Sequence, residues 1–212
     1  MTTADYEANS NSWSAAFPAP QPTQDTDLLR QIGFIPRLKE VLMLRQVHRL
    51  EHATVWVLSG AAHTSIPGDN RSQASIDSGG LGGLSTEQGF YLYGQVKTSD
   101  VSRAVSEALR RIKSEWNLAV HPRCGTNLSV EVLLTAGLAW GAFALLPKGA
   151  IEQLLGFGVA ATAAAQLTPE LGRVVQQYVM TAIPFNLEVQ DISAVQDAWS
   201  RPAHFVRVQW IE

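Results

Sequence analysis

The segment "RQVHRLEHATVW", residues 45–56, contains three side chains with the types and spacing of a metal site and its general base. His48 and His52 are four residues apart, so on a helix they share one face and can bind one metal ion. Glu51 stands beside that face. The order His-x-x-Glu-His is the inverzincin signature, in which the histidines bind zinc and the glutamate takes a proton from the zinc-bound water. A solvated helix face or an ion-pair network is the alternative interpretation of the same pattern.

A second segment, "AVHPRCGTN" at residues 119–127, offers further zinc ligands. His121 and Cys124 are three residues apart, and both side chains are of types that zinc prefers. Pro122 fixes one backbone dihedral and Gly125 frees another, so a tight turn can aim both side chains at one point. The alternatives are a small buried core residue for Cys124 and a turn-capping histidine for His121.

The number of ligands decides what such a site can do. A structural zinc site has four protein ligands, whereas a catalytic site has three and keeps one position open for water. If His48, His52, His121 and Cys124 all bind, we expect a structural site. If His121 or Cys124 stays outside, we expect an open catalytic site with Glu51 as general base.

The elements that must position these residues follow from hydrophobic periodicity. Apolar residues at helical spacing predict one helix over residues 38–61, which carries the His-x-x-Glu-His motif. Residues 63–85 are rich in glycine and predict a long loop. A strand is predicted at residues 89–96, followed by a helix capped by Ser99 or Asp100 and a short extended run at "NLAVHP".

Two apolar runs, residues 128–146 and 150–167, predict a helical hairpin. Because a spanning helix needs roughly 17–25 apolar residues, we expect the hairpin to cross a membrane. A buried hairpin in a soluble protein is the alternative. Arg and Lys residues precede the first run closely, and only Lys148 lies in the turn, so the bulk of the chain is expected on the cytoplasmic side.

The rest of the chain completes an α+β fold, with a small sheet, packed helices and the apolar hairpin. After Pro169 the sequence predicts a helix and then two strands, "FNLEVQDI" and "HFVRVQWI", at least one of which should join the strand at 89–96. We expect four regions: a disordered tail at 1–29, the metal-site region at 30–127, the hairpin at 128–167 and the C-terminal region at 168–212.

Composition excludes several classes of function. The net charge is −3 and no basic stripe is present, which argues against nucleic acid as a partner. A single cysteine makes an intrachain disulfide impossible. The first 27 residues contain no basic start followed by an apolar run, so no secretory signal is predicted.

The motifs "HRLEH" and "HPRCGT", followed directly by an apolar helix, resemble those of the uncharacterised bacterial YqhQ-like membrane proteins. The resemblance covers roughly residues 37–197 and includes Thr181, Pro184, Glu188 and Val189 near its end. That family is described as a domain of unknown function and as predicted metal-dependent enzymes. The resemblance implies a metal site at His48, His52, His121 and Cys124 with Glu51 near it. This chain has a longer Gly-rich loop and less spanning sequence than those relatives.

These observations favour a membrane-anchored, zinc-dependent protein of hydrolase type. Its expected partners are the lipid bilayer and a protein partner or peptide substrate. The rival hypothesis is a membrane scaffold or assembly factor without catalysis, in which the histidines form a structural metal site or a hydrogen-bonded helix junction.

Overall fold

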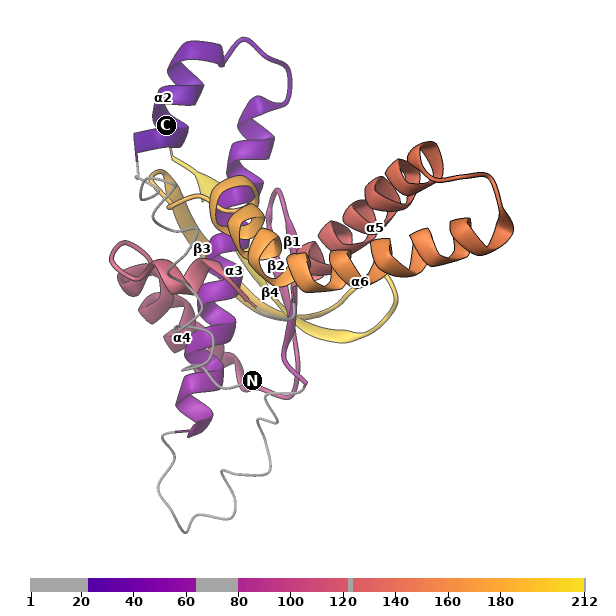
Figure 1. The fold of residues 1–212 in the computed structure, drawn as a ribbon. Helices are drawn as coiled ribbons and strands as arrows, with labels where there is room; N and C mark the ends of the chain where they lie inside the picture. The colour runs from indigo at the N-terminus through magenta and orange to yellow at the C-terminus, as the bar shows by residue number, and fades with distance from the viewer. Residues whose placement is uncertain (1–22, 64–79, 122–123, 212) are drawn as a thin grey trace. The chain divides into compact units, whose positions relative to one another are not determined.

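The computed structural model describes residues 23–63, 80–121 and 124–211 (Figure 1). The chain divides into two compact units. The sheet unit comprises residues 22–121 and 176–212, and the hairpin unit contains residues 122–175. The fold is α+β, as the sequence predicts, because helices pack against an antiparallel sheet in one unit and against each other in the other.

A four-stranded sheet forms the base of the sheet unit, with strand order β1-β2-β4-β3. The strands are β1 (Gly82–Thr86), β2 (Gly89–Tyr93), β3 (Leu187–Gln196) and β4 (Pro202–Trp210). All neighbours are antiparallel, and β2 pairs with β4 through partners such as Phe90 and Val206. This pairing confirms that a C-terminal strand joins the strand predicted at 89–96.

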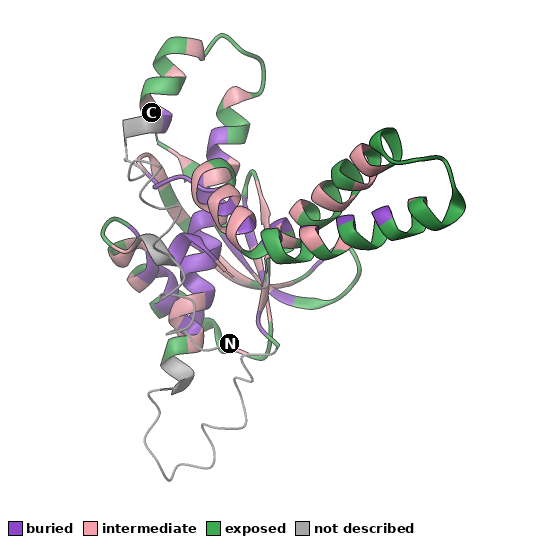
Figure 2. Ribbon diagram, viewed as in Figure 1, coloured by how far each residue is buried: buried purple, intermediate pink, exposed green. Residues whose placement is uncertain are grey.

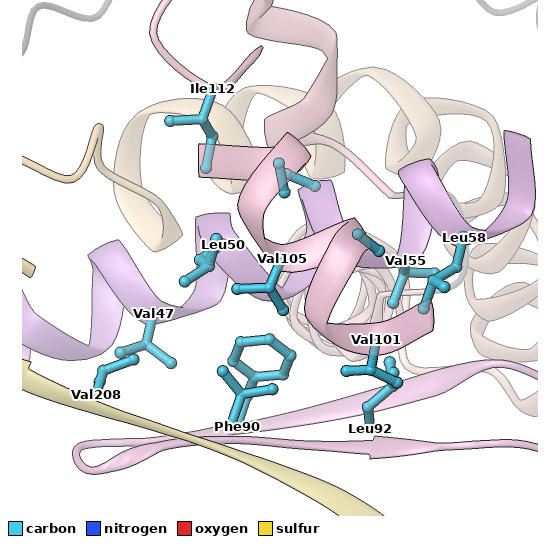
Figure 3. Packing of buried hydrophobic residues seen from close by; sticks show 14 of the residues in the cluster. Val47, Leu50, Val55, Leu58, Phe90, Leu92, Val101, Val105, Ile112 and Val208 are labelled. Atoms are coloured by element: carbon cyan, nitrogen blue, oxygen red, sulfur yellow. The ribbon is translucent and has the colours of Figure 1, made fainter. Parts of the chain in front are cut away.

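Helices α3 (Leu38–His63) and α4 (Thr98–Arg111) cover one face of this sheet (Figure 3). The alternation of β2 turns Phe90 and Leu92 into the core, and both are fully buried. The helices contribute aliphatic side chains at helical spacing to the same core: Val47, Leu50, Val55, Leu58, Val101, Val105 and Ile112. This packing fixes the position of the middle of α3, where the histidine motif lies.

The N-terminal prediction needs a correction. Helix α2 (Thr23–Ile32) occupies part of the region that we predicted to be a disordered tail. Asp25 in its first turn is buried and accepts a hydrogen bond from Arg45 of α3 at 2.7 Å. This contact joins residues 20 apart in the sequence, so local composition does not indicate it. Residues 1–22 of the predicted tail lie outside the described part of the chain.

Three further boundaries differ from the predictions. Strand β1 begins at Gly82, inside the predicted loop, because its backbone pairs with β2; residues 64–79 of that loop lie outside the described residues. The N-cap of α4 is Lys97 rather than Ser99 or Asp100. The run predicted as extended begins with a short 3-10 helix, η2 (Trp116–Ala119).

The hairpin unit consists of α5 (Gly125–Leu145) and α6 (Ala150–Val174). Both are long and apolar enough to cross a membrane by length and composition. Most of their surface is exposed (Figure 2), including Leu133 at 72% and Trp140 at 74%. A line of residues spaced four apart on α6 is buried instead: Gly156, Ala160, Ala164, Thr168 and Gly172.

Helix α6 does not end at residue 167, where the predicted second apolar run ends. It continues through Pro169 and runs into a π-helix, η3 (Val175–Met180). Proline lacks an N–H and so removes one helical hydrogen bond. The Thr168 hydroxyl donates a hydrogen bond to the Ala164 carbonyl at 2.7 Å, one turn earlier in the same helix. The predicted second apolar run and the predicted C-terminal helix are therefore one helix.

Candidate metal centre

Helix α3 places His48 and His52 on one face, with ring centroids 4.3 Å apart. His52 is 2% exposed and His48 is half-buried. The rings are edge-to-face rather than stacked. The i, i+4 spacing thus brings two imidazoles together, as one metal ion requires.

The tautomer of His52 is determined by a backbone contact. Its Nδ1 lies 2.7 Å from the carbonyl oxygen of Ala119 and must donate, because a carbonyl can only accept. In the neutral ring this leaves Nε2 without a proton and able to bind a metal. Metal-binding histidines in proteins usually donate their second ring N–H to such an acceptor, which fixes the ring orientation.

The segment that supplies this carbonyl is itself anchored to α3. The indole N–H of Trp56 donates to the Val120 carbonyl at 2.8 Å, one turn of α3 beyond His52. The backbone N–H of His121 donates to the side-chain oxygen of Gln176 at 2.8 Å. The His121 ring lies 5.8 Å from the His52 ring and 5.6 Å from the Trp56 ring. Residues 119–121 therefore line the motif face of α3.

Cys124 follows His121 by three residues and is the N-cap of α5. Its sulfur accepts a hydrogen bond from the Thr126 N–H, and its thiol donates to the Thr126 hydroxyl at 3.2 Å. A helix N-terminus stabilises negative charge, and cysteine binds metals as the thiolate. His48, His52 and Cys124 form a set of three side chains of metal-ligating types that could hold a metal ion.

The donor set fits zinc better than a hard cation. Two imidazoles and a thiolate are preferred zinc ligands, whereas magnesium and calcium take oxygen. Around a tetrahedral zinc ion with bonds of about 2.0–2.3 Å, ligand atoms are roughly 3.3–3.8 Å apart. His121, the fourth expected ligand, lies beside His52 but is not part of this set of three.

Glu51 points to the sheet rather than into the set of three. It is 7% exposed, and its carboxylate accepts a hydrogen bond from the hydroxyl of Ser85 on β1. A side chain at Gly83 would overlap this carboxylate, so the strand approaches Glu51 closely only because it has a glycine there. Burial raises the pKa of Glu51 to about 7, against the opposing effect of the Ser85 hydrogen bond.

Burial affects the two histidines in the opposite direction, because it disfavours the charged imidazolium. The pKa of His52 falls to about 3 through burial and the neighbouring His48. Burial also lowers the pKa of His48. Both rings are therefore neutral near pH 7, which is the form that binds a metal.

Sequence reasoning did not predict the residues that support this cluster. Ser85 and Gly83 lie at the end of a stretch that we predicted to be a loop, and Gln176 lies in a helix without any motif. Gln176 is completely buried, and a buried polar side chain needs partners, but burial is known only once the fold is known.

Comparisons with known proteins match this chain to uncharacterised sequences. The family described as "Domain of unknown function (DUF6391)" matches residues 43–192. An uncharacterised protein of Picosynechococcus sp. (strain ATCC 27264 / PCC 7002 / PR-6) is 49% identical over 199 residues, covering 93% of this chain and 95% of that protein. No solved structure matches. These matches do not confirm the resemblance to YqhQ-like proteins or to metal-dependent enzymes.

Proposed function

The chain belongs to the family of the domain of unknown function DUF6391, and we propose that it is a membrane-anchored zinc protein of hydrolase type. The hydrogen bond from His52 Nδ1 to Ala119 carries this proposal. This hydrogen bond leaves one ring nitrogen of His52 free to bind a metal, and His48 and Cys124 would supply two more donor atoms. A hydrogen-bonded helix junction alone would not need three donors of zinc-preferred types.

His48, His52 and Cys124 would hold the ion, and three protein ligands leave a fourth position open. Zinc bound in this way lowers the pKa of a water molecule to near neutrality and polarises a carbonyl group. Glu51 is one helical turn from His48 and has a pKa of about 7, so its carboxyl group can accept and release a proton near neutral pH. Ser85 holds that carboxyl group toward the sheet through its hydrogen bond, so as general base Glu51 would exchange this hydrogen bond for one to the metal-bound water. A peptide is the substrate class that we propose, by analogy with the inverzincin motif.

The apolar hairpin is the proposed membrane anchor. The exposed faces of α5 and α6 carry large apolar side chains, which are costly in water and favourable in lipid. The bulk of the chain would lie on the cytoplasmic side, since Lys148 is the one cation in the turn and Arg110, Arg111 and Lys113 precede the hairpin.

The enzymatic proposal is tested with zinc-loaded protein in detergent and a panel of fluorogenic peptides. Wild type should hydrolyse at least one peptide, and Glu51→Gln should lower kcat by about 100-fold or more while retaining zinc. His48→Ala should lose both zinc and activity. Equal activity of wild type and Glu51→Gln would rule out Glu51 as the general base.

A structural zinc site in a membrane scaffold is the second candidate. Its support is His121, whose ring is only 5.8 Å from that of His52 and could complete four ligands. X-ray absorption at the zinc edge distinguishes the two candidates. Two imidazoles, one sulfur and one further light atom support the open site, whereas three imidazoles and one sulfur support the closed site.

A further inference from the structure

The turn between α2 and α3, residues 33–37, presents two large apolar side chains to solvent. Phe34 is 83% exposed and Ile35 is 42% exposed. The turn is ordered by backbone hydrogen bonds from Ile35 to Ile32 and from Leu38 to Ile35. An ordered turn that exposes a phenylalanine and an isoleucine side by side is typical of a contact surface.

The charged residues nearest to Phe34 and Ile35 are cations, and acidic residues follow only at Asp27 and Glu40 on either side. The stretch "LLRQIGFIPRLK", residues 28–39, contains Arg30, Arg37 and Lys39 and no acidic residue. Asp27 lies 4.0 Å from Arg30, but both side chains are largely exposed and water screens the pair. Apolar side chains flanked by cations match an anionic lipid surface, where the rings enter the acyl boundary and the cations meet headgroups.

Contacts within the sheet unit connect this turn to the end of the long apolar helix. Arg45 of α3 pairs with Asp25 of α2 at 2.7 Å. The same guanidinium donates to the carbonyls of Tyr178 and Thr181, at the end of the helix that begins at Ala150. Arg45 lies eight residues after Arg37, which is about 12 Å along a helix. The turn is thus attached through α3 to the segment that leads out of the hairpin.

We propose that Phe34 and Ile35 insert into the headgroup region of an anionic bilayer, with Arg30 and Arg37 contacting lipid phosphates. This second membrane contact rests on the proposed hairpin anchor and would hold the sheet unit at the membrane surface. The metal centre would then work on substrates at that surface.

Single cysteines labelled with an environment-sensitive fluorophore test the insertion. Phe34→Cys, Leu133→Cys on α5 and Arg103→Cys on α4 are made in a Cys124→Ser background and reconstituted in vesicles. The vesicles contain phosphatidylcholine and phosphatidylglycerol at about 3:1, since anionic lipid is the proposed ligand. Nitroxide lipids quench the label at known depths. We expect quenching at Phe34 by shallow nitroxides, quenching at Leu133 by deep nitroxides, and none at the exposed Arg103 position.

Labels at these three positions distinguish insertion of the Phe34 turn from membrane insertion of the hairpin. Quenching at Leu133 with a water-like label at Phe34 would overturn the insertion and leave the anchor. Quenching at Phe34 without quenching at Leu133 would support the insertion and overturn the anchor. A Phe34 label that is shielded from water but not quenched by lipid would indicate a protein contact, such as a second copy, and would also overturn the insertion.

The role of the cations is tested by Arg30→Gln combined with Arg37→Gln. Quenching at Phe34 should fall at least two-fold in the anionic vesicles and change little in pure phosphatidylcholine. An equal effect in both kinds of vesicle would contradict recognition of anionic lipid.

Discussion

The Nδ1 atom of His52 donates a hydrogen bond to the carbonyl oxygen of Ala119, 67 residues further along the chain, at 2.7 Å. This contact links the two segments in which the sequence places candidate ligands, and it leaves the other ring nitrogen of His52 available for a metal. Because the acceptor is a backbone atom, the residue type at position 119 does not reveal it.

Replacing Gly83 with alanine should destabilise the sheet unit. The added Cβ would overlap the Glu51 carboxylate, which cannot move aside without losing its buried hydrogen bond to Ser85. We expect a loss of about 1–3 kcal/mol of unfolding free energy, the usual range for overpacking. Gly82→Ala is the matched control, because no atom lies within 4 Å of a Cβ built there. Equal effects of the two substitutions in denaturant unfolding would contradict the placement of Glu51.

The stability of the metal-free protein should depend on pH through Glu51. Its pKa is about 7 in the folded protein against an ordinary value of 4.5, so folding favours the protonated form. The stabilisation is complete below pH 4.5 and is lost as pH rises through 7. Glu51→Gln lacks this dependence. Between pH 4 and pH 8, the unfolding free energy of Glu51→Gln should therefore rise by roughly 3 kcal/mol relative to that of wild type, because each pKa unit corresponds to about 1.36 kcal/mol.

The difference in unfolding free energy between wild type and Glu51→Gln, measured at each pH, separates the effect of Glu51 from that of His52, because both proteins contain His52. The pKa of His52 is lowered, so its contribution has the opposite sign, and stability is lost as pH falls below 6.5. Ser85→Ala provides a further check, since removing the hydrogen bond should move the Glu51 midpoint to higher pH. If the difference in unfolding free energy between wild type and Glu51→Gln stayed constant across this pH range, the burial of the Glu51 carboxyl group would be contradicted.

Gln176 should position the metal centre without binding the metal. Its side-chain oxygen accepts the His121 N–H at 2.8 Å and so holds the segment that carries the Ala119 carbonyl. Gln176→Leu should weaken zinc binding by about 10-fold, as is usual when a group that orients ligands is lost. Gln177→Leu is the neighbouring control. Isothermal titration with zinc provides the measurement, and unchanged affinity of Gln176→Leu would exclude the positioning role.

The hairpin should be sensitive to volume at Gly156 but not at Gly158. A Cβ at Gly156 would lie 2.5 Å from Leu146 Cδ1 and 3.2 Å from Ala142 Cβ, whereas nothing lies within 4 Å at Gly158. Gly156→Ile should therefore separate α5 from α6 and lower the thermal stability in detergent, and Gly158→Ile should leave it unchanged. A smaller effect at Gly156 than at Gly158 would contradict this packing.

The sequence predicts the elements with strong periodicity and misses those that depend on distant partners. Helix α3, the hairpin and the C-terminal strands follow from local patterns. Helix α2 does not, and its contact with α3 through the Asp25–Arg45 pair becomes visible only in the fold. Strand β1 does not either, because glycines carry no strand signal until β2 pairs with them. Pro169 misled the prediction, since long helices can accommodate a proline within their length.

In the candidate site, too, some features follow from local sequence patterns and others depend on contacts between distant segments. Spacing predicts that His48 and His52 share a helix face, whereas residue type, the predicted turn after His121 and the family resemblance nominate Cys124. That Glu51 faces Ser85, and that His121 lies beside His52 but outside the set of three, depends on the packing of β1 and residues 119–121 against α3.

The zinc content of the purified protein, measured by mass spectrometry after dialysis, tests the metal centre most directly. We expect about one zinc ion per chain in wild type, as three N/S ligands require. His48→Ala and Cys124→Ser should each lose it, and Glu51→Gln should retain it. Wild type without stoichiometric metal after zinc loading, or His48→Ala with undiminished zinc, would contradict a metal centre at this site.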